Sequence, residues 1–543
     1  MQTYDAVIIG AGHNGLTCAA YLGRGGARVK VVERRAMVGG AAVTEEFHPG
    51  FRNSVAAYTV SLLNPKVIAD LKLHQHGLRI VERRLQNFVP DLDGNYLIAA
   101  EGRTKAEIAK FSTKDAARYD DFRRDVDAVA DVLRALVLET PPNVVEGLNA
   151  RSLGEMIKAL SLANRLRRLS MAERRALLDL FAKSAGDYLD GFFEGDLVKA
   201  LFGFDAVVGN YASPYAPGSA YVLLHHAFGE VNGKKGVWGH ALGGMGAITQ
   251  AMAHAARANG VEIETGAGVR EVIVEKGRAA GIVLDDGRAL RAHCVIAGVN
   301  PKLLYERLLP AAALPAEFLR RMRQWRCGSG TFRMNVALSR LPRFSALRDP
   351  GPHLTSGIIL APSLAYMDRA WRDATEHGWS REPIIELLIP STLDDSLTPH
   401  GAHVASLFCQ HTAPELPDGS SWDLHKDKVA DLMIATVDRF APGFKESVVG
   451  RQVLSPLDLE REFGLIGGDI FHGALTLDQL FSARPMLGYA DYRGPLKGLY
   501  LCGSGAHPGG GVTGAPGHNA ARAVLADLRW RLLGQRLFGR GPA

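Results

Sequence analysis

The fold is decided near the start of the chain, where residues 4–16 read YDAVIIGAGHNGL. A short apolar run ends at Gly10, and a stretch of helical composition follows up to Leu22. A second apolar run, residues 28–32, ends directly before Glu33. This order predicts a strand, a helix and a second, parallel strand, with GxGxxG at the first turn and an acid 18 residues after its last glycine.

Each part of this unit suits a dinucleotide. Gly10 permits a tight turn, Gly12 lets the backbone approach a pyrophosphate, and Gly15 permits close packing of the helix on the strand. The free N–H groups at the start of the helix then face the phosphates. Glu33 can accept hydrogen bonds from ribose hydroxyls. The motif alone does not choose between FAD and NAD, and the Arg34–Arg35 pair suits either a 2′-phosphate or plain solvation.

Two further glycine-rich segments favour FAD. Residues 39–42 read GGAA, six residues after Glu33, where a second stretch of backbone could lie along the diphosphate and ribityl chain; the alternative is an ordinary turn. Near the C-terminus an apolar strand, residues 498–502, leads into GSGAHPGGGVTGAPGHN at 503–519 and a helix from Ala520 to about Leu533. A dinucleotide held by both ends of the chain suits FAD, which is long and permanently bound.

The remaining segments predict how the domains are arranged. Residues 261–299 form short strands with tight turns, typical of a β-meander, and a hairpin is expected around residues 91–94. We therefore expect an α/β protein with a dinucleotide-binding domain that includes the meander and a second domain that includes much of residues 301–480. The helical region of residues 104–200 is expected to form a cap.

Composition narrows the class of protein. The chain has 543 residues, 47% of them hydrophobic, and a net charge of only +6. Its five cysteines form no CxxC, which argues against a disulfide scaffold, and no histidine, cysteine and carboxylate grouping has the spacing of a metal site. No basic run interleaved with aromatic residues indicates nucleic acid. The first strand begins near Tyr4 and no run of about 18 apolar residues occurs, so we expect a cytoplasmic protein with no signal peptide, transit peptide or transmembrane helix.

One segment of the predicted cap is basic and amphipathic. Ser152 and Glu155 have the spacing of a capping box, which predicts a helix start at Ser152. One predicted helix places five arginines beside leucines: Arg165, Arg167, Arg168, Arg174 and Arg175. Such a helix can lie on an anionic bilayer, which would make the protein peripheral to a membrane, or it can be a solvated face.

These segments together resemble the phytoene desaturase and amine oxidase superfamily of FAD-dependent oxidoreductases. The resemblance rests on residues 10–42, YVLLHH at 221–226, GGMG at 243–246, GDIFHG at 468–473 and residues 496–517, so it extends along the whole chain. It implies a glutathione-reductase-type fold with a discontinuous, Rossmann-type FAD-binding domain in residues 1–75, 238–300 and 485–543. An inserted α+β substrate domain is then expected in residues 76–237, with the helical cap, and 301–484. The resemblance also implies that FAD contacts Gly10, Gly12, Gly15, Glu33, Arg34, Gly39, Gly40, Ala41, Ala42, Val269, Gly503, Ser504, Gly511, Val512 and Thr513.

The implied activity is oxidation of an apolar or amphipathic substrate by hydride transfer to flavin N5. A base is needed only where the substrate also loses a proton. The candidates are His225, His226, Asp205, Asp469 and His472. Each could instead be structural, and the paired histidines could be packed in the core. Disulfide reduction is disfavoured because no cysteine pair is visible in the sequence. Two other functions stay open: a flavin-holding regulatory protein with a partner protein, and a flavin-dependent isomerase. The sequence does not define the oligomeric state.

Overall fold

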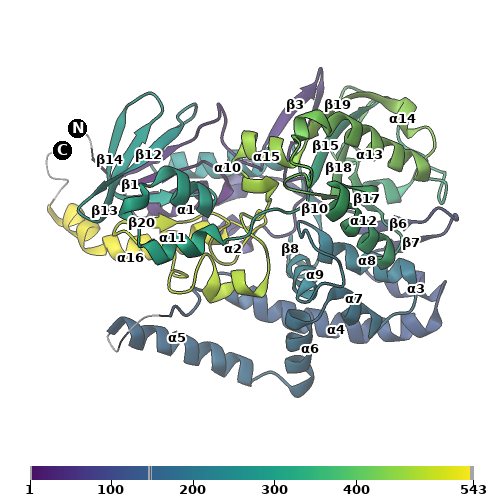
Figure 1. Cartoon of the computed structure of the whole chain (residues 1–543), viewed down its shortest axis with the longest axis horizontal. Helices are drawn as coiled ribbons and strands as arrows, with labels where there is room; N and C mark the ends of the chain where they lie inside the picture. The colour runs from purple at the N-terminus through teal and green to yellow at the C-terminus, as the bar shows by residue number, and fades with distance from the viewer. Residues whose placement is uncertain (1–2, 145–146, 148–149, 539–543) are drawn as a thin grey trace.

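The computed structural model describes residues 3–144, 147 and 150–538. Its described part contains two seven-stranded sheets, which lie side by side, and a group of helices along one edge of the molecule (Figure 1). No helix in these ranges is both long enough and apolar enough to cross a membrane.

The first sheet has the strand order β11–β2–β1–β14–β13–β12, and β20 pairs with β14. Its strands are β1 (Thr3–Ile9), β2 (Val29–Val32), β11 (Glu262–Glu264), β12 (Val269–Glu275), β13 (Arg278–Leu284), β14 (Ala289–Ala297) and β20 (Leu499–Leu501). β1 is parallel to β2 and β14, and β12, β13 and β14 form the expected antiparallel meander. The strands come from three separate stretches of chain, which confirms a discontinuous Rossmann-type fold.

Three helices accompany this sheet: α1 (His13–Arg24), α10 (Met245–Ala258) and α16 (Ala515–Phe538). α1 contacts both α10 and α16, so the first and last segments of the chain share one core. α16 begins at Ala515, five residues before the predicted start at Ala520. Pro516 lies in its first turn, where a proline costs no helical hydrogen bond.

The second sheet has the order β19–β15–β18–β17–β16–β6–β7. Its strands are β6 (Asn87–Pro90), β7 (Tyr96–Ala99), β15 (Phe332–Leu338), β16 (Gly357–Leu360), β17 (Trp379–Leu388), β18 (His403–Thr412) and β19 (Val448–Leu454). The β6–β7 pair is the predicted hairpin. α13 (Lys426–Phe440) packs on the face that carries Phe332, Met334 and Leu407. The alternation of a strand therefore turns Arg333 and Phe408 to the opposite face.

The helical group consists of α3 (Thr104–Ala109), α4 (Thr113–Leu136), α5 (Ala150–Arg167), α6 (Met171–Ala182), α7 (Ala185–Asp190), α8 (Asp196–Val207) and α9 (Ser219–Ala227). The prediction of one arginine-rich helix was wrong, because α5 ends at Arg167 and α6 begins at Met171. Ser170 and Glu173 form a capping box: the Ser170 hydroxyl accepts from the Glu173 N–H (3.2 Å), and the Glu173 carboxylate accepts from the Ser170 N–H (2.7 Å). This cap starts a new helix.

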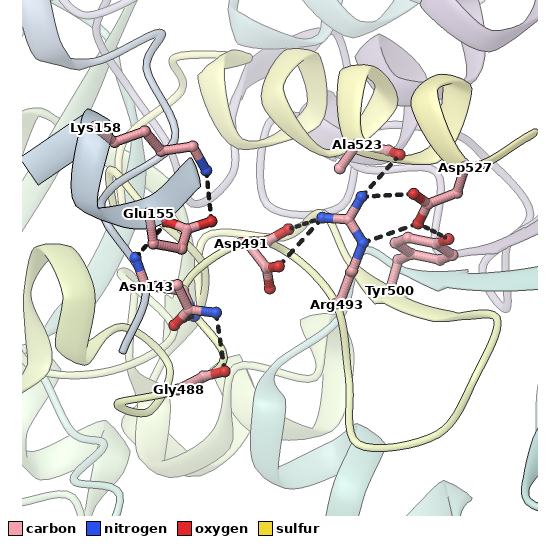
Figure 2. A network of polar contacts seen from close by, with 10 residues as sticks. Asn143, Glu155, Lys158, Gly488, Asp491, Arg493, Tyr500, Ala523 and Asp527 are labelled. Carbon is pink, nitrogen blue, oxygen red and sulfur yellow. Dashed lines mark hydrogen bonds and ion pairs between the residues drawn. The ribbon is translucent and has the colours of Figure 1, made fainter. Parts of the chain in front are cut away.

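α5 projects from the body of the molecule below the first sheet (Figure 1). It already includes Ala150, so Ser152 does not cap it, and the capping box predicted there was wrong. Glu155 instead accepts a hydrogen bond from the backbone N–H of Asn143 (2.7 Å) and pairs with Lys158 (2.8 Å). The Asn143 side chain donates to the Gly488 carbonyl (2.9 Å), as Figure 2 shows. These contacts attach one end of α5 to the C-terminal segment.

Candidate active site

The GxGxxG turn forms a cradle at the start of α1. Gly10 directly follows β1 and has a φ of +94°, which favours glycine. A Cβ at Gly15 would lie 2.1 Å from the Gly10 carbonyl oxygen, so this glycine permits the contact of helix with strand. A Cβ at Gly12 would meet nothing within 4 Å, and no side chain caps the helix there. The first N–H groups of α1 thus face open space beside Gly12, as a phosphate would require.

Glu33 and the second glycine pair complete this end of the site. One Glu33 oxygen accepts from the Ala11 N–H (2.9 Å) and the other from the Arg35 N–H (3.0 Å). Each oxygen keeps a further lone pair for a ribose hydroxyl. The Gly39 N–H donates to the Ala11 carbonyl (2.8 Å), which holds the two glycine-rich stretches together. The Arg34 side chain donates to the Arg461 carbonyl (2.9 Å), a contact with the protein itself.

The C-terminal glycine loop closes over the cradle. The Asn14 amide donates to the Ser504 hydroxyl (3.2 Å) and so joins the two ends of the chain. Gly503 packs behind the site, where a Cβ would lie 2.8 Å from the Gly298 carbonyl oxygen. The Thr513 hydroxyl accepts from the Ala515 N–H (3.0 Å) at the start of α16. Gly503 and Thr513 shape the loop from outside the cavity.

Most of the predicted contact residues line one cavity. They are Gly10, Gly12, Glu33, Arg34, Gly40, Ala41, Ala42, Val269, Ser504, Gly511, Val512, His226 and His472. Gly15, Gly39, Gly503, Thr513 and His225 do not line it. Four buried polar atoms of lining residues have no hydrogen-bond partner among the described residues: His13 Nε2, Asn14 Oδ1, Arg35 Nη1 and His472 Nδ1. The open cradle, the Glu33 carboxylate and these unsatisfied atoms fit FAD, with its pyrophosphate beside Gly12 and its ribose beside Glu33.

Beyond the glycine loops the cavity continues into a mainly apolar chamber, which we call the flavin chamber. It is lined by Tyr58, Leu62, Val208, His226, Trp238, Phe408, Ile470, Phe471 and His472. These residues come from the segment before α2 (Pro65–Asp70), from the end of α8, from α9, from the residue before β10 (Gly239–Ala241), from β18 and from the loop after residue 468. An apolar group would be shielded from water here, next to the cofactor cradle.

Two aromatic residues of the chamber lining, Tyr58 and Phe408, pack against the buried residues Arg333 and Glu386, which do not line the chamber. Cross-strand pairing sets Phe408 directly beside both Arg333 and Glu386. The Tyr58 ring stacks on Phe408 at 5.2 Å, and its hydroxyl donates to Glu386 (2.5 Å). The Arg333 guanidinium lies 4.6 Å from the centre of the Tyr58 ring, and burial raises the pKa of Tyr58 well above its usual value. Tyr58 is thus fixed between a cation and a carboxyl group.

The three predicted histidines have different surroundings. His225 packs against Phe228 and Phe471 (ring centroids 5.1 and 5.6 Å apart) and lies outside the chamber lining. His226 contacts the Val222 carbonyl oxygen through Nδ1 (2.8 Å), and burial lowers its pKa to about 4. Burial lowers the pKa of His472 to about 3, with smaller contributions from His13 and Arg484. His226 and His472 are therefore neutral imidazoles at the wall of the chamber.

Arg484 holds the His472 turn against the C-terminal loop. Its fully buried guanidinium donates to the carbonyls of Phe471 (2.8 Å), Gly473 (3.3 Å) and Ser504 (2.8 Å). Burial lowers its pKa to about 10, so the side chain stays charged at neutral pH. The sequence did not indicate Arg484, because its partners are backbone atoms that only the folded loops bring together.

The structure also brings together two cysteines that the sequence places 484 residues apart. Cys18 of α1 lies close to Cys502, which follows β20, and burial, with a smaller contribution from Cys502, raises the pKa of Cys18 well above its usual value. Both are fully buried, and neither lines the cavity. A thiol in such a position is unreactive, so this pair does not supply disulfide chemistry.

Comparison with known proteins agrees with the geometry of the site. The family described as flavin containing amine oxidoreductase matches residues 15–332, and the chain belongs to this family. Pyridine nucleotide-disulfide oxidoreductase domain-containing protein 2 of Rattus norvegicus is 42% identical over 97% of this chain and 94% of its own. One of the subunits of limonene dehydrogenase from Castellaniella defragrans is 25% identical over 96% of this chain and 95% of its own.

Solved structures share the fold. An oxidoreductase from Methanosarcina mazei superimposes with a TM-score of 0.60 at 18% identity, over 96% of this chain and 99% of that chain. Together with the family match and the dinucleotide cradle, this confirms the predicted FAD and the predicted class. The protein is an FAD-dependent oxidoreductase.

Proposed function

We propose that this enzyme oxidises an apolar or amphipathic molecule held in the flavin chamber. The observation that carries this proposal is the continuity of the cofactor cradle with a chamber walled by Tyr58, Val208, Phe408, Ile470 and Phe471. FAD supplies the hydride-accepting N5 there. The side chains orient the substrate and exclude water, which strengthens every polar interaction inside. The name of the relative that dehydrogenates limonene, a hydrocarbon, agrees with an apolar substrate.

Where the substrate also loses a proton, His472 is the acceptor that we propose first, and His226 is the second. Both line the chamber as neutral imidazoles, and Nδ1 of His472 has no partner within the described residues. Their low pKa values make them weak bases, so such a proton transfer requires a substrate whose C–H bond is already polarised.

The test is anaerobic mixing of the FAD-loaded enzyme with monoterpenes, polyenes, lipids and amines, followed by flavin absorbance. We expect an apolar compound to bleach the flavin. For a substrate that also loses a proton, the His472→Gln variant should bleach about a hundredfold more slowly while its substrate affinity stays the same. Product analysis separates desaturation from isomerisation, which leaves no net reduction. If no compound bleaches a flavin that stays bound, the alternative of a flavin-holding regulatory protein gains support instead.

We also propose that α5 makes a peripheral contact with an anionic lipid surface. Four apolar side chains, each more than half exposed, follow the i, i+3, i+4, i+7 spacing on one face: Leu153, Met156, Ile157 and Leu160. The basic residues Arg165, Arg167, Arg168, Arg174 and Arg175 lie on α5, on α6 and between them. An apolar stripe with neighbouring cations is the pattern of a helix that lies in a bilayer interface.

A further inference from the structure

A second cavity lies directly against the flavin chamber. It is formed by α4, α8, α9, the β6–β7 hairpin and the segment before β10 (Gly239–Ala241). Among the described residues, His226 and Trp238 line both this cavity and the flavin chamber. Their rings are almost parallel, with an interplanar angle of 13° and centroids 6.3 Å apart. One pair of side chains therefore separates the two cavities.

The lining of the second cavity changes from polar to apolar with depth. Exposed residues, Glu101, Lys234 and Lys235, stand at its mouth, and buried residues such as Phe122 and Leu223 line its inner part. A molecule with a polar end and an apolar end would match this gradient.

The cations of the second cavity are neutralised by the protein itself. Arg123 pairs with Asp127 (2.8 Å), Lys234 with Glu82 (2.7 Å) and Lys235 with Asp131 (2.7 Å). These three carboxylates do not line the cavity. The basic residues at the mouth are thus already paired and do not require an anionic ligand.

Unlike these basic residues, Asp205 of α8 is not paired within the described part of the protein. Its carboxyl group lines the cavity and has no hydrogen bond or ion pair to any described residue. Burial, with a smaller contribution from the charge of Glu386, raises the pKa of Asp205 to about 8, and Arg123 opposes this shift. The group is therefore protonated at neutral pH and can donate one hydrogen bond to an oxygen atom.

The position of the second cavity suits it as a route by which substrate enters the flavin chamber. The first cavity opens to solvent near the exposed residues Arg34 and Asp285, the end that the nucleotide part of FAD would fill. With the cofactor bound, a substrate needs another way in. The second cavity adjoins the chamber on the side away from that opening, at His226 and Trp238.

We propose that the second cavity binds the uncharged, oxygen-bearing end of an elongated amphipathic substrate through Asp205, while its apolar end passes Trp238 into the flavin chamber. This inference rests on the proposed function and specifies the substrate class. Trp238 is then the residue that determines which shapes reach the flavin.

The test uses the FAD-loaded protein and 1-decanol as the probe, with binding followed by calorimetry at pH 7 and pH 9.5. We expect wild-type protein to bind decanol more weakly at pH 9.5, where Asp205 has ionised. The other groups that face Asp205 are Arg123, Glu386, His226 and, at the mouth, Glu101, Lys234 and Lys235. Tyr119 also lines the cavity. All these groups are kept in Asp205→Asn, so a pH dependence that this variant retains belongs to them and not to Asp205.

Two substitutions of Asp205 distinguish the effect of its hydrogen bond from the effect of its ionisation. Asp205→Asn keeps an N–H donor, so it should bind decanol at pH 7 and show no pH dependence. Asp205→Leu should bind about tenfold more weakly at both pH values, the loss expected for one buried hydrogen bond. Equal binding by Asp205→Leu and wild type would overturn the proposal, and so would tighter binding of decylamine than of decanol.

Access past Trp238 has its own readout, the quenching of flavin fluorescence by iodide. Trp238→Ala should increase quenching because it joins the two cavities, whereas Trp530→Ala, at an exposed surface tryptophan, should leave it unchanged. Unchanged quenching in Trp238→Ala would show that the route lies elsewhere. These measurements need no turnover, so they remain decisive even if no compound bleaches the flavin.

Discussion

At the scale of single residues, Gly12 and Gly15 share one motif but have different surroundings. Gly12 borders open space, whereas a Cβ at Gly15 would meet the Gly10 carbonyl. Gly12→Val should therefore fold and lose its FAD, because the side chain would occupy the place of the pyrophosphate. Gly15→Ala should instead lower the melting temperature of the FAD-free protein. Flavin content after gel filtration and thermal melting of both variants check this, and a yellow Gly12→Val protein would contradict the assignment of the cradle.

Substitution of Glu33 is expected to weaken FAD binding less than the Gly12→Val substitution does. Glu33→Ala removes the acceptor for the ribose and for the Ala11 and Arg35 N–H groups. Affinity for FAD should fall by about 1–3 kcal/mol, the range for a hydrogen bond to a charged group. Glu33→Gln keeps one acceptor oxygen and should lie between wild type and Glu33→Ala. Titration of the FAD-free protein with FAD measures all three, and equal affinities would exclude Glu33 as a ribose ligand.

The hydrogen bonds of Asp394 lead to a prediction about how the stability of the fold depends on pH. It accepts hydrogen bonds from the Gly243 N–H (2.7 Å) and the Ser396 hydroxyl (2.6 Å) and contacts His240 (3.0 Å). Burial alone would raise its pKa, but these hydrogen bonds outweigh burial and hold the pKa below the usual 3.8. A lowered pKa in the folded state stabilises the fold above the unfolded pKa, and this contribution is lost as the pH falls through the folded value.

Asp394→Asn should accordingly lower the stability at pH 7 and pH 5 by about 1–3 kcal/mol. Below about pH 4 the difference from wild type should shrink, because the unfolded chain then binds a proton at Asp394 that the folded protein, with its lowered pKa, does not yet bind. Denaturant unfolding across this range measures the difference. A gap that stays constant down to pH 3 would show that the charge of Asp394 does not contribute.

At the scale of elements, the sequence predicted those strands, helices and turns that depend on short-range patterns. The alternation and glycine spacing of residues 4–33 predicted β1, α1 and β2, and the turn around residues 91–94 predicted the β6–β7 hairpin. The break between α5 and α6 was missed although Ser170 and Glu173 carry its signal. Two capping-box patterns lie within one apolar-periodic stretch, and only tertiary contacts, such as that of Glu155 with Asn143, decide which is used.

The contact of α1 with the end of β20 leads to a prediction for the cysteines. Cys18 and Cys502 meet inside the core, away from the cavity. Replacing all five cysteines by Ala or Ser should leave FAD binding and reduction of the flavin by dithionite intact. Stability should fall, because the core loses buried side chains. A defect in substrate-driven flavin reduction traced to the Cys18–Cys502 pair would revive disulfide chemistry.

At the scale of the whole molecule, the substrate end of the site could not be predicted from the sequence. Tyr58, Arg333, Glu386 and Phe408 meet only because the register of β15, β17 and β18 aligns three of them and a distant loop brings the fourth. The cofactor end could be predicted, since its glycines lie in short motifs whose backbone demands are local. Register and loop packing depend on long-range contacts, which leave no periodic signal.

The helix α5, which projects as an arm from the body of the molecule, leads to a prediction about binding to anionic vesicles. Burial of a large apolar side chain contributes roughly 1.5–3 kcal/mol, whereas each basic residue near an anionic surface contributes roughly 1 kcal/mol. The apolar stripe should therefore dominate binding. Leu153→Asp with Ile157→Asp should abolish sedimentation with phosphatidylserine vesicles at any salt concentration. Reversing the charges of Arg165, Arg168 and Arg175 should weaken it by about a hundredfold at low salt and less at high salt, because salt screens the charges.

The control is Leu424→Asp, at an exposed leucine just before α13, which should sediment like wild type and bind FAD normally. The contacts of Glu155 with Asn143 and Lys158, visible in Figure 2, lie outside the substituted stripe, so the arm should keep its attachment in every variant. Wild-type protein that ignores the vesicles at low salt and is dimeric by light scattering would show that the stripe pairs two copies of the chain. In that case Leu153→Asp with Ile157→Asp would yield a monomer.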